Sequence, residues 1–194
     1  MNVISTASAV TASLLVAAVF VSTTPAAARK PVARYTANAL NIASDIGPPA
    51  TLVDIEVDRW STSDEENQLA APLATNRQSD AVALLTRLPR IGIIRALDLA
   101  GEPIYYARRT ARPDKSEHVM LVASRPLRAF EASMKPNMSA FPFSVIELDV
   151  DASGKGTGKL ELAATLSGAP ERGITAVPDH IILPVRLTKV ERKK

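Results

Sequence analysis

Six carboxylates, one arginine and the only tryptophan of the chain lie in one short stretch, VDIEVDRWSTSDEENQL at 53–69. Asp54, Glu56 and Asp58 alternate with apolar residues, so a β-strand would carry all three on one face, about 7 Å apart. Such a row can bind a cation or act as a general acid and base. Its more common role is ion pairing across neighbouring strands. The expected partners are Arg108 and Arg112 in YYARRTAR, and Lys159.

The second half of the same stretch has the pattern of a helix start. Thr62 followed three residues later by Glu65 matches a capping box, and Ser63 with Glu66 offers a second register. Acidic residues in a first helical turn are stabilised by the helix dipole. The sequence therefore predicts that a strand ends near Trp60 and that a capped helix begins directly after it, with its carboxylates in structural roles.

Three residues are candidates to face a ligand: Trp60, Tyr106 and Arg108. Trp60 follows the acidic face of its strand, and Arg108 shares a strand face with Tyr106. Two interpretations of Trp60 stay open. It either packs beneath the first helix or forms an aromatic platform at the mouth of a barrel.

The Gly-rich stretch DVDASGKGTGKL, at 149–160, matches two ligand loops only in part. As a calcium loop it fails at Gly156 and Leu160, where an apolar residue and a bidentate Glu are needed. As a phosphate loop it fails because Gly156 separates Gly-Lys from the following Thr. A hairpin turn between two strands is the prediction.

Metal and nucleophile chemistry has little support in the composition. The chain has no Cys, which excludes disulfides and a thiolate nucleophile, and its two histidines, His118 and His180, lack a paired-ligand spacing. No metal site and no cofactor is predicted. The leading functional hypothesis is a non-enzymatic protein that binds a small ligand or an envelope protein. The alternative is a hydrolase with dispersed residues such as the histidines and the acidic strand.

The elements follow the order strands, helices, strands. Period-two alternation predicts about eight strands, with a helical insertion at about 62–88 after the second strand. After Pro89 no link is long enough for a crossover helix, so neighbouring strands are expected to be antiparallel. The predicted fold is mainly β (α+β), either a barrel or a two-layer sandwich. One helical turn near Phe130 and an edge or bulge at Pro184 are also expected.

The N-terminal residues have the pattern of an export signal. An apolar run from Ala7 to Val21 is followed by small residues ending at Ala28, which predicts a signal peptide at 1–28. A membrane anchor is the alternative, but the run is shorter than the roughly 20 residues that a bilayer needs. The predicted mature chain, 29–194, is one β-rich domain with no membrane span, located in the periplasm or secreted.

The net charge of +3 comes largely from the final KVERKK, which is predicted to be a solvated terminus. No basic stripe is interleaved with aromatic residues, so nucleic acid is not an expected partner.

Four segments resemble a family of uncharacterised exported bacterial proteins: IEVDRWSTSDEENQL, LPRIGIIR, RPLRAFEA and FPFSVIELDVDASGKGTGKLEL. The resemblance extends from about Tyr35 to Glu191. Members of that family look like single-domain proteins of similar length, so the resemblance implies an exported chain with one domain. It implies no activity, ligand or partner.

Overall fold

The structure is a computed structural model that describes residues 30–40, 50–96, 100–125, 127, 140–170, 172–178 and 183–193. The predicted signal peptide, the predicted helical turn near Phe130 and His180 lie outside these residues. Among the described residues, no helix is long and apolar enough to cross a membrane.

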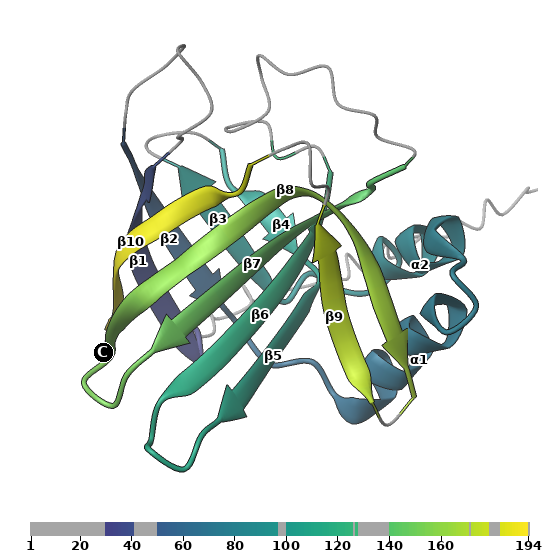
Figure 1. Ribbon diagram of the computed structural model, residues 1–194, viewed down its shortest axis with the longest axis horizontal. Coiled ribbons are helices and arrows are strands. Elements are labelled where there is room, and N and C mark those ends of the chain that lie inside the picture. Colours follow the sequence, from purple (N-terminus) through teal and green to yellow (C-terminus); the bar gives the residue numbers. More distant parts are fainter. Residues whose placement is uncertain are drawn as a thin grey trace, which may run out of the picture.

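The described residues form ten antiparallel strands in one sheet and two helices (Figure 1). Before the helices come β1 (Ala33–Leu40) and β2 (Thr51–Val57). The helices are α1 (Ser63–Leu73) and α2 (Gln78–Leu85). After them come β3 (Gly92–Ala96), β4 (Glu102–Ile104), β5 (Tyr106–Ala111), β6 (Glu117–Ser124), β7 (Phe143–Val150), β8 (Lys155–Ala169), β9 (Gly173–Pro178) and β10 (Val185–Lys193).

The sheet is curled but not closed. Its strand order is β4-β3-β2-β1-β10-β8-β7-β6-β5, with β9 paired to β8. The two ends of this order, β4 and β5, are separated in the chain only by Tyr105, so the sheet must bend until its ends approach each other. No ladder joins β4 to β5 among the described strands. The barrel alternative is therefore wrong, and an open sheet or a sandwich describes the fold.

Two local features explain why the strand count is ten and not about eight. The expected single strand at 102–112 is broken at Tyr105, because β4 pairs with β3 while β5 pairs with β6. Ser61, in the connection from β2 to α1, hydrogen-bonds both backbone groups of Ala107 on β5. Its N–H donates to the Ala107 carbonyl at 2.9 Å, and its hydroxyl accepts from the Ala107 N–H at 3.0 Å. The second feature is β9, which the sequence pattern did not predict.

The inward side of the curl holds the larger apolar cluster, here called the inner core. The alternation in β2 accounts for its share, since Val53, Ile55 and Val57 are fully buried there. Burial of each such side chain contributes roughly 1.5–3 kcal/mol. The other strands contribute in the same way, and the cluster includes Tyr35, Ile94, Leu121, Ile146, Leu148, Leu160 and Leu187. These side chains fill the interior as a packed core.

A second cluster, here called the helix-side core, lies between the helices and the other face of β5–β9. In Figure 1 the helices lie beside β9 and the final part of β8. Because β6 is covered on both faces, its residues alternate between the two cores: Val119 and Leu121 pack inward, and Met120 and Val122 pack toward the helices. The continuous apolar run in β6 is what burial on both faces requires.

The helical insertion lies where the sequence predicts it. Thr62 is the N-cap of α1: its hydroxyl accepts from the Glu65 N–H at 3.2 Å, and the Glu65 carboxylate accepts from the Thr62 N–H at 2.9 Å. Arg59 donates two further hydrogen bonds to that carboxylate, at 2.8 and 2.6 Å. These bonds lower the pKa of Glu65, and the largest cause is the bond from Arg59. The capping box is confirmed in its first register. Pro72 lies in the last turn of α1, one residue before its end.

Replacing Thr62 with Ala should lower the free energy of unfolding by about 0.5–2 kcal/mol, because the Glu65 N–H loses its acceptor. Ser63→Ala is the matched control, since Ser63 belongs to the second register and does not cap the helix. That control should stay within about 0.5 kcal/mol of wild type. Urea unfolding of both variants gives the comparison. Equal losses for the two would contradict the assignment of the cap.

The β7–β8 hairpin confirms the predicted turn in the Gly-rich stretch. Asp151 organises it: its carboxylate accepts from the N–H and hydroxyl of Ser153, at 2.8 and 2.6 Å, and from the Lys155 N–H at 3.0 Å. Gly154 has a φ of 84°, which favours glycine. Gly156 lies where β8 runs very close to β7: a Cβ there would be 1.8 Å from the Asp149 carbonyl oxygen.

The expectation for Pro184 is wrong in part. Pro184 lies directly before β10, which is a central strand between β1 and β8. Proline is tolerated there because the first position of a strand need not donate to the ladder. The bulge in β10 lies further along, between Leu187 and Val190, where Lys189 has a positive φ of 49°.

Candidate functional site

The ends of several strands meet at one end of the curled sheet, here called the hairpin end. The pairing register shows this directly. The start of β1 pairs with the ends of β2 and β10, at Ala33↔Val57 and Arg34↔Lys193. The end of β10 pairs with the start of β8, and the start of β6 pairs with the end of β7. The β5–β6 and β7–β8 turns therefore lie together, in the lower part of Figure 1.

A cleft of about 660 Å³ lies at the hairpin end, and we call it the basic cleft. Its walls come from the segment before β1, the two hairpin turns and the end of β10. Its charged lining residues are five bases and two acids: Lys30, Arg34, Lys115, Arg192, Lys193, Glu117 and Asp151. The volume lies within the range of about 300–1,000 Å³ that small-ligand sites occupy.

The two carboxylates of the basic cleft are already engaged. Asp151 is held by the turn hydrogen bonds described above, which lower its pKa, those from Ser153 having the largest effect. Glu117 accepts from Nη1 of Arg192 with both oxygens, at 3.0 and 3.1 Å. By contrast, Lys30 and Lys115 have no ion pair among the described residues. The lining of the cleft therefore carries net positive charge, although Arg34 and Lys193 pair with carboxylates outside it, Glu56 and Glu191.

Three charged side chains meet at the wall of the cleft, and we call them the Glu117 cluster: Glu117 and Arg192, which line the cleft, and Arg109 next to them. Glu117 and Arg109 lie at period two from Val119 and Ala107, which belong to the inner core. Nη1 of Arg109 lies 3.5 Å from Oε1 of Glu117, the oxygen that is 3.0 Å from Arg192. Two arginines thus share one carboxylate, whose side chain is 17% exposed.

Two aromatic residues accompany the Glu117 cluster. The Arg109 guanidinium carbon lies 5.3 Å from the centroid of the Trp60 ring, a cation–π distance. Tyr35 is fully buried, and its hydroxyl has no hydrogen-bond partner among the described residues. Burial raises the pKa of Tyr35, while the nearby charge of Arg192 opposes that rise. A buried hydroxyl without a hydrogen-bond partner is uncommon in a protein interior, and this one lies next to the Glu117 cluster.

The structure separates the three candidate ligand-facing residues. Trp60 is partly buried against the inner core at the hairpin end, and does not lie in the helix-side core. Tyr106 is fully buried in the helix-side core. Arg108, two residues further along the same face of β5, pairs with Glu66 of α1 at 2.7 Å. A Cβ on Gly173 of β9 would be 2.1 Å from Nη1 of Arg108, so this arginine joins α1, β5 and β9. That each of these residues faces a ligand stays a prediction.

The carboxylates on the acidic face of β2 form ion pairs across strands, as predicted, but their partners are not the predicted ones. Asp54 and Glu56 face arginines of the two neighbouring strands, Arg34 of β1 and Arg95 of β3. The expected partners pair elsewhere: Arg112 with Asp149 at 2.7 Å, and Lys159 with Glu147 and Glu161 at 2.8 and 3.1 Å. The predicted partners were wrong because they lie on or directly after β5, and on β8, and neither strand is a neighbour of β2 in the sheet.

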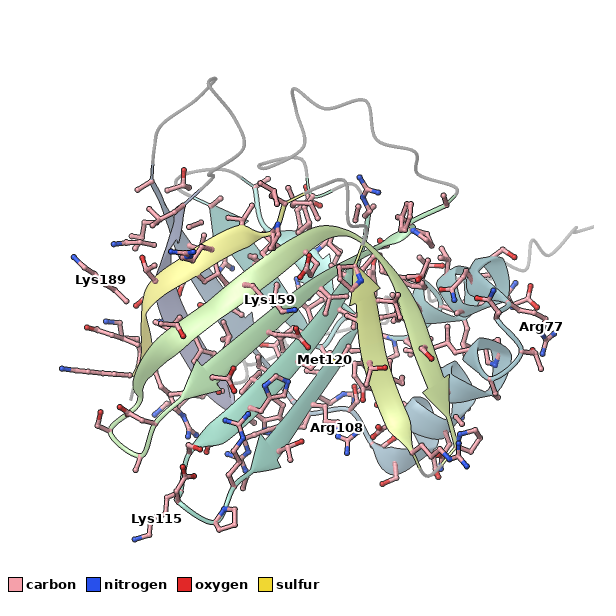
Figure 2. All side chains as sticks on the ribbon, viewed as in Figure 1. Arg77, Arg108, Lys115, Met120, Lys159 and Lys189 are labelled. Atoms are coloured by element: carbon pink, nitrogen blue, oxygen red, sulfur yellow. The ribbon has the colours of Figure 1, made fainter. Side chains whose placement is uncertain are left out.

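His118 lies on the outward face of β6, between two carboxylates of β7. Its Nδ1 is 3.1 Å from Asp149, and its Nε2 is 3.9 Å from Glu147. Lys159 extends the row on β8, and Figure 2 shows Lys159, Met120 and Arg108 across this face of the sheet. No serine hydroxyl is among the partners of His118 in the described residues. Nor do the described residues group three or more His, Asp or Glu side chains that could hold a metal ion.

Comparison with protein-family models, with curated proteins and with solved structures found no match for this chain. The resemblance to exported bacterial proteins therefore stays a prediction. The sequence pattern did not identify the Glu117 cluster. The available signal was a charge at an inward position of an alternating strand: Arg109 two residues after Ala107, and Glu117 two residues before Val119.

Proposed function

We propose that this protein is an exported, non-enzymatic binding protein that takes an anionic small ligand into the basic cleft. The observation that carries the proposal is the net positive charge of the cleft, in which five bases face two acids and Lys30 and Lys115 have no ion pair among the described residues. Export rests on the sequence pattern at 7–28 alone.

The chemistry of the lining favours an oxyanion, that is a carboxylate or a phosphate. Arginine offers up to five donors in a planar arrangement that matches such groups, and lysine adds a mobile point charge. Among the described residues, the side-chain hydrogen bonds of Arg192 run from its Nη1 to Glu117, so a ligand would meet this guanidinium beside that carboxylate. The cations come from separate segments around the cleft, so a ligand with more than one anionic group would contact them best.

Calorimetry with tripolyphosphate and citrate at low ionic strength tests the proposal. Wild-type protein should bind at least one of these probes with one-to-one stoichiometry, and added salt should weaken binding. Lys115→Glu should weaken it by about tenfold or more, equivalent to about 1.4 kcal/mol. The backbone strain at Lys115, whose φ is 65°, is the same for both long side chains.

Arg87→Glu is the matched control, because Arg87 is an exposed arginine after α2, outside the cleft. It changes the net charge by the same amount and should leave binding within about twofold of wild type. Equal losses in the two variants would show attraction to net charge alone and would contradict a site at the cleft. If neither tripolyphosphate nor citrate binds, the proposal is wrong.

A further inference from the structure

We propose that Glu117 is an internal counter-ion for Arg192 and that an anionic ligand displaces it. The displaced Glu117 carboxylate then moves toward Arg109, and this movement changes the contact of Arg109 with Trp60. The inference rests on the proposed function, because it describes how the same cleft would respond to its ligand.

The first step is competition for Arg192. Glu117 and Arg192 both line the basic cleft, so an anion bound to Arg192 also lies close to the Glu117 carboxylate. Like charges repel strongly in a partly buried site, where the effective dielectric constant is far below that of water. Glu117 already occupies the position that a ligand oxyanion would take against Nη1 of Arg192. Binding of the ligand therefore pushes Glu117 away from Arg192.

The second step follows because a second arginine is already in place. Nη1 of Arg109 is 3.5 Å from Oε1 of Glu117, slightly beyond a good charged hydrogen bond of about 2.7–2.9 Å. When Arg192 turns to the ligand, Glu117 can shorten its contact with Arg109 without losing its pairing. Exchange of one arginine for the other keeps the carboxylate neutralised throughout, so the movement leaves no buried charge unpaired.

The third step links this exchange to the tryptophan. The Arg109 guanidinium lies over the Trp60 ring, and the ring itself packs against the inner core. A shorter Arg109–Glu117 contact therefore moves the guanidinium relative to a fixed ring. Because Trp60 is the only tryptophan of the chain, tryptophan fluorescence reports on the surroundings of this one ring, which include the Arg109 guanidinium.

Fluorescence and calorimetric titrations with tripolyphosphate, run in parallel, test the relay. In wild-type protein a saturable change in Trp60 emission should follow the calorimetric isotherm. Glu117→Gln keeps the shape of the side chain and removes its charge, so Arg192 has no competing anion. Binding should become about three- to tenfold tighter in this variant, and the change in Trp60 emission should be reduced by at least about half.

Arg109→Lys is the second variant, and it keeps the positive charge but loses the planar group over the ring. Calorimetry should still detect binding of tripolyphosphate to this variant, and the emission change should be lost. Thermal melts of both variants establish that they are folded before they are titrated.

The outcomes separate this inference from the proposed function. If calorimetry shows binding, but Trp60 emission does not change and Glu117→Gln binds no more tightly, the relay is wrong and the anion site stands. Weaker binding by Glu117→Gln would also overturn the relay, because Glu117 would then position Arg192 for the ligand. If neither wild type nor Glu117→Gln binds, both proposals are wrong.

Discussion

Gly156→Ala should destabilise the protein by at least about 3 kcal/mol, the upper end of the cost of overpacking. A Cβ at this position would lie 1.8 Å from the carbonyl oxygen of Asp149 and 2.8 Å from its carbonyl carbon. Both atoms are backbone of β7, so no side-chain rotation can relieve the overlap. The two strands would have to separate at the base of the β7–β8 hairpin, which forms one wall of the basic cleft.

Two neighbouring substitutions serve as controls for this result. Thr157→Ala changes an exposed side chain on the same strand and should stay within about 0.5 kcal/mol of wild type. Gly154→Ala adds a Cβ that would be 3.4 Å from Cβ of Arg192, an ordinary contact, so its cost is the left-handed backbone alone, about 1–2 kcal/mol. Urea unfolding measures all three. A loss at Gly156 no larger than that at Gly154 would contradict the close approach of β7 and β8.

Tyr106→Ala should remove about 3–5 kcal/mol from the free energy of unfolding, as loss of a large buried aromatic side chain does. The Tyr106 ring is fully buried in the helix-side core. Its hydroxyl has no hydrogen-bond partner among the described residues, so Tyr106→Phe keeps the packing and removes an unsatisfied polar group. Phenylalanine at this position should be within about 1 kcal/mol of wild type at neutral pH. A large loss for Tyr106→Phe would show that the hydroxyl has a partner.

Comparison of wild type with Tyr106→Phe also tests how the free energy of unfolding changes with pH. Burial, and then the charge of Glu66, raise the pKa of Tyr106, against a smaller lowering by Arg108. The unfolded chain ionises its tyrosines near pH 10. The contribution of Tyr106 is therefore fully present below about pH 10 and is lost progressively as the pH rises toward the raised value of the folded state. Tyr106→Phe should unfold less readily than wild type above about pH 10. Thermal melts from neutral to alkaline pH compare the two.

Local patterns predicted the local structure well. Val53, Ile55 and Val57 were expected on one face of a strand, and they are fully buried together in β2. Thr62 and Glu65 were expected to form a capping box, and they do. These predictions succeeded because each depends on residues within a few positions of one another, where side-chain periodicity and capping hydrogen bonds are decided.

The features that the sequence did not reveal depend on distant parts of the chain. Asp54 and Glu56 pair with arginines of β1 and β3, and only the strand order identifies those neighbours. Arg109, Glu117 and Arg192 meet because the sheet curls at the hairpin end, and alternation along one strand contains no information about curl. β9 was missed because GITAVP is short and is bounded by Gly173 and Pro178, which are typical of turns.

The contact of Ser61 with Ala107 also affects how the protein behaves at high concentration. Sheets with free outer strands can recruit further chains through unpaired backbone groups, which leads to aggregation. Here the outer side of β5 is blocked at Ala107, because Ser61 occupies both of its backbone groups. Among the described strands, β4 and β9 also keep an unpaired side, and each contains a proline, Pro103 or Pro178, which cannot donate to an added strand. Features that hinder edge-to-edge association thus lie on each of these strands: one serine of a connecting loop on β5, and a proline in each of the short strands β4 and β9.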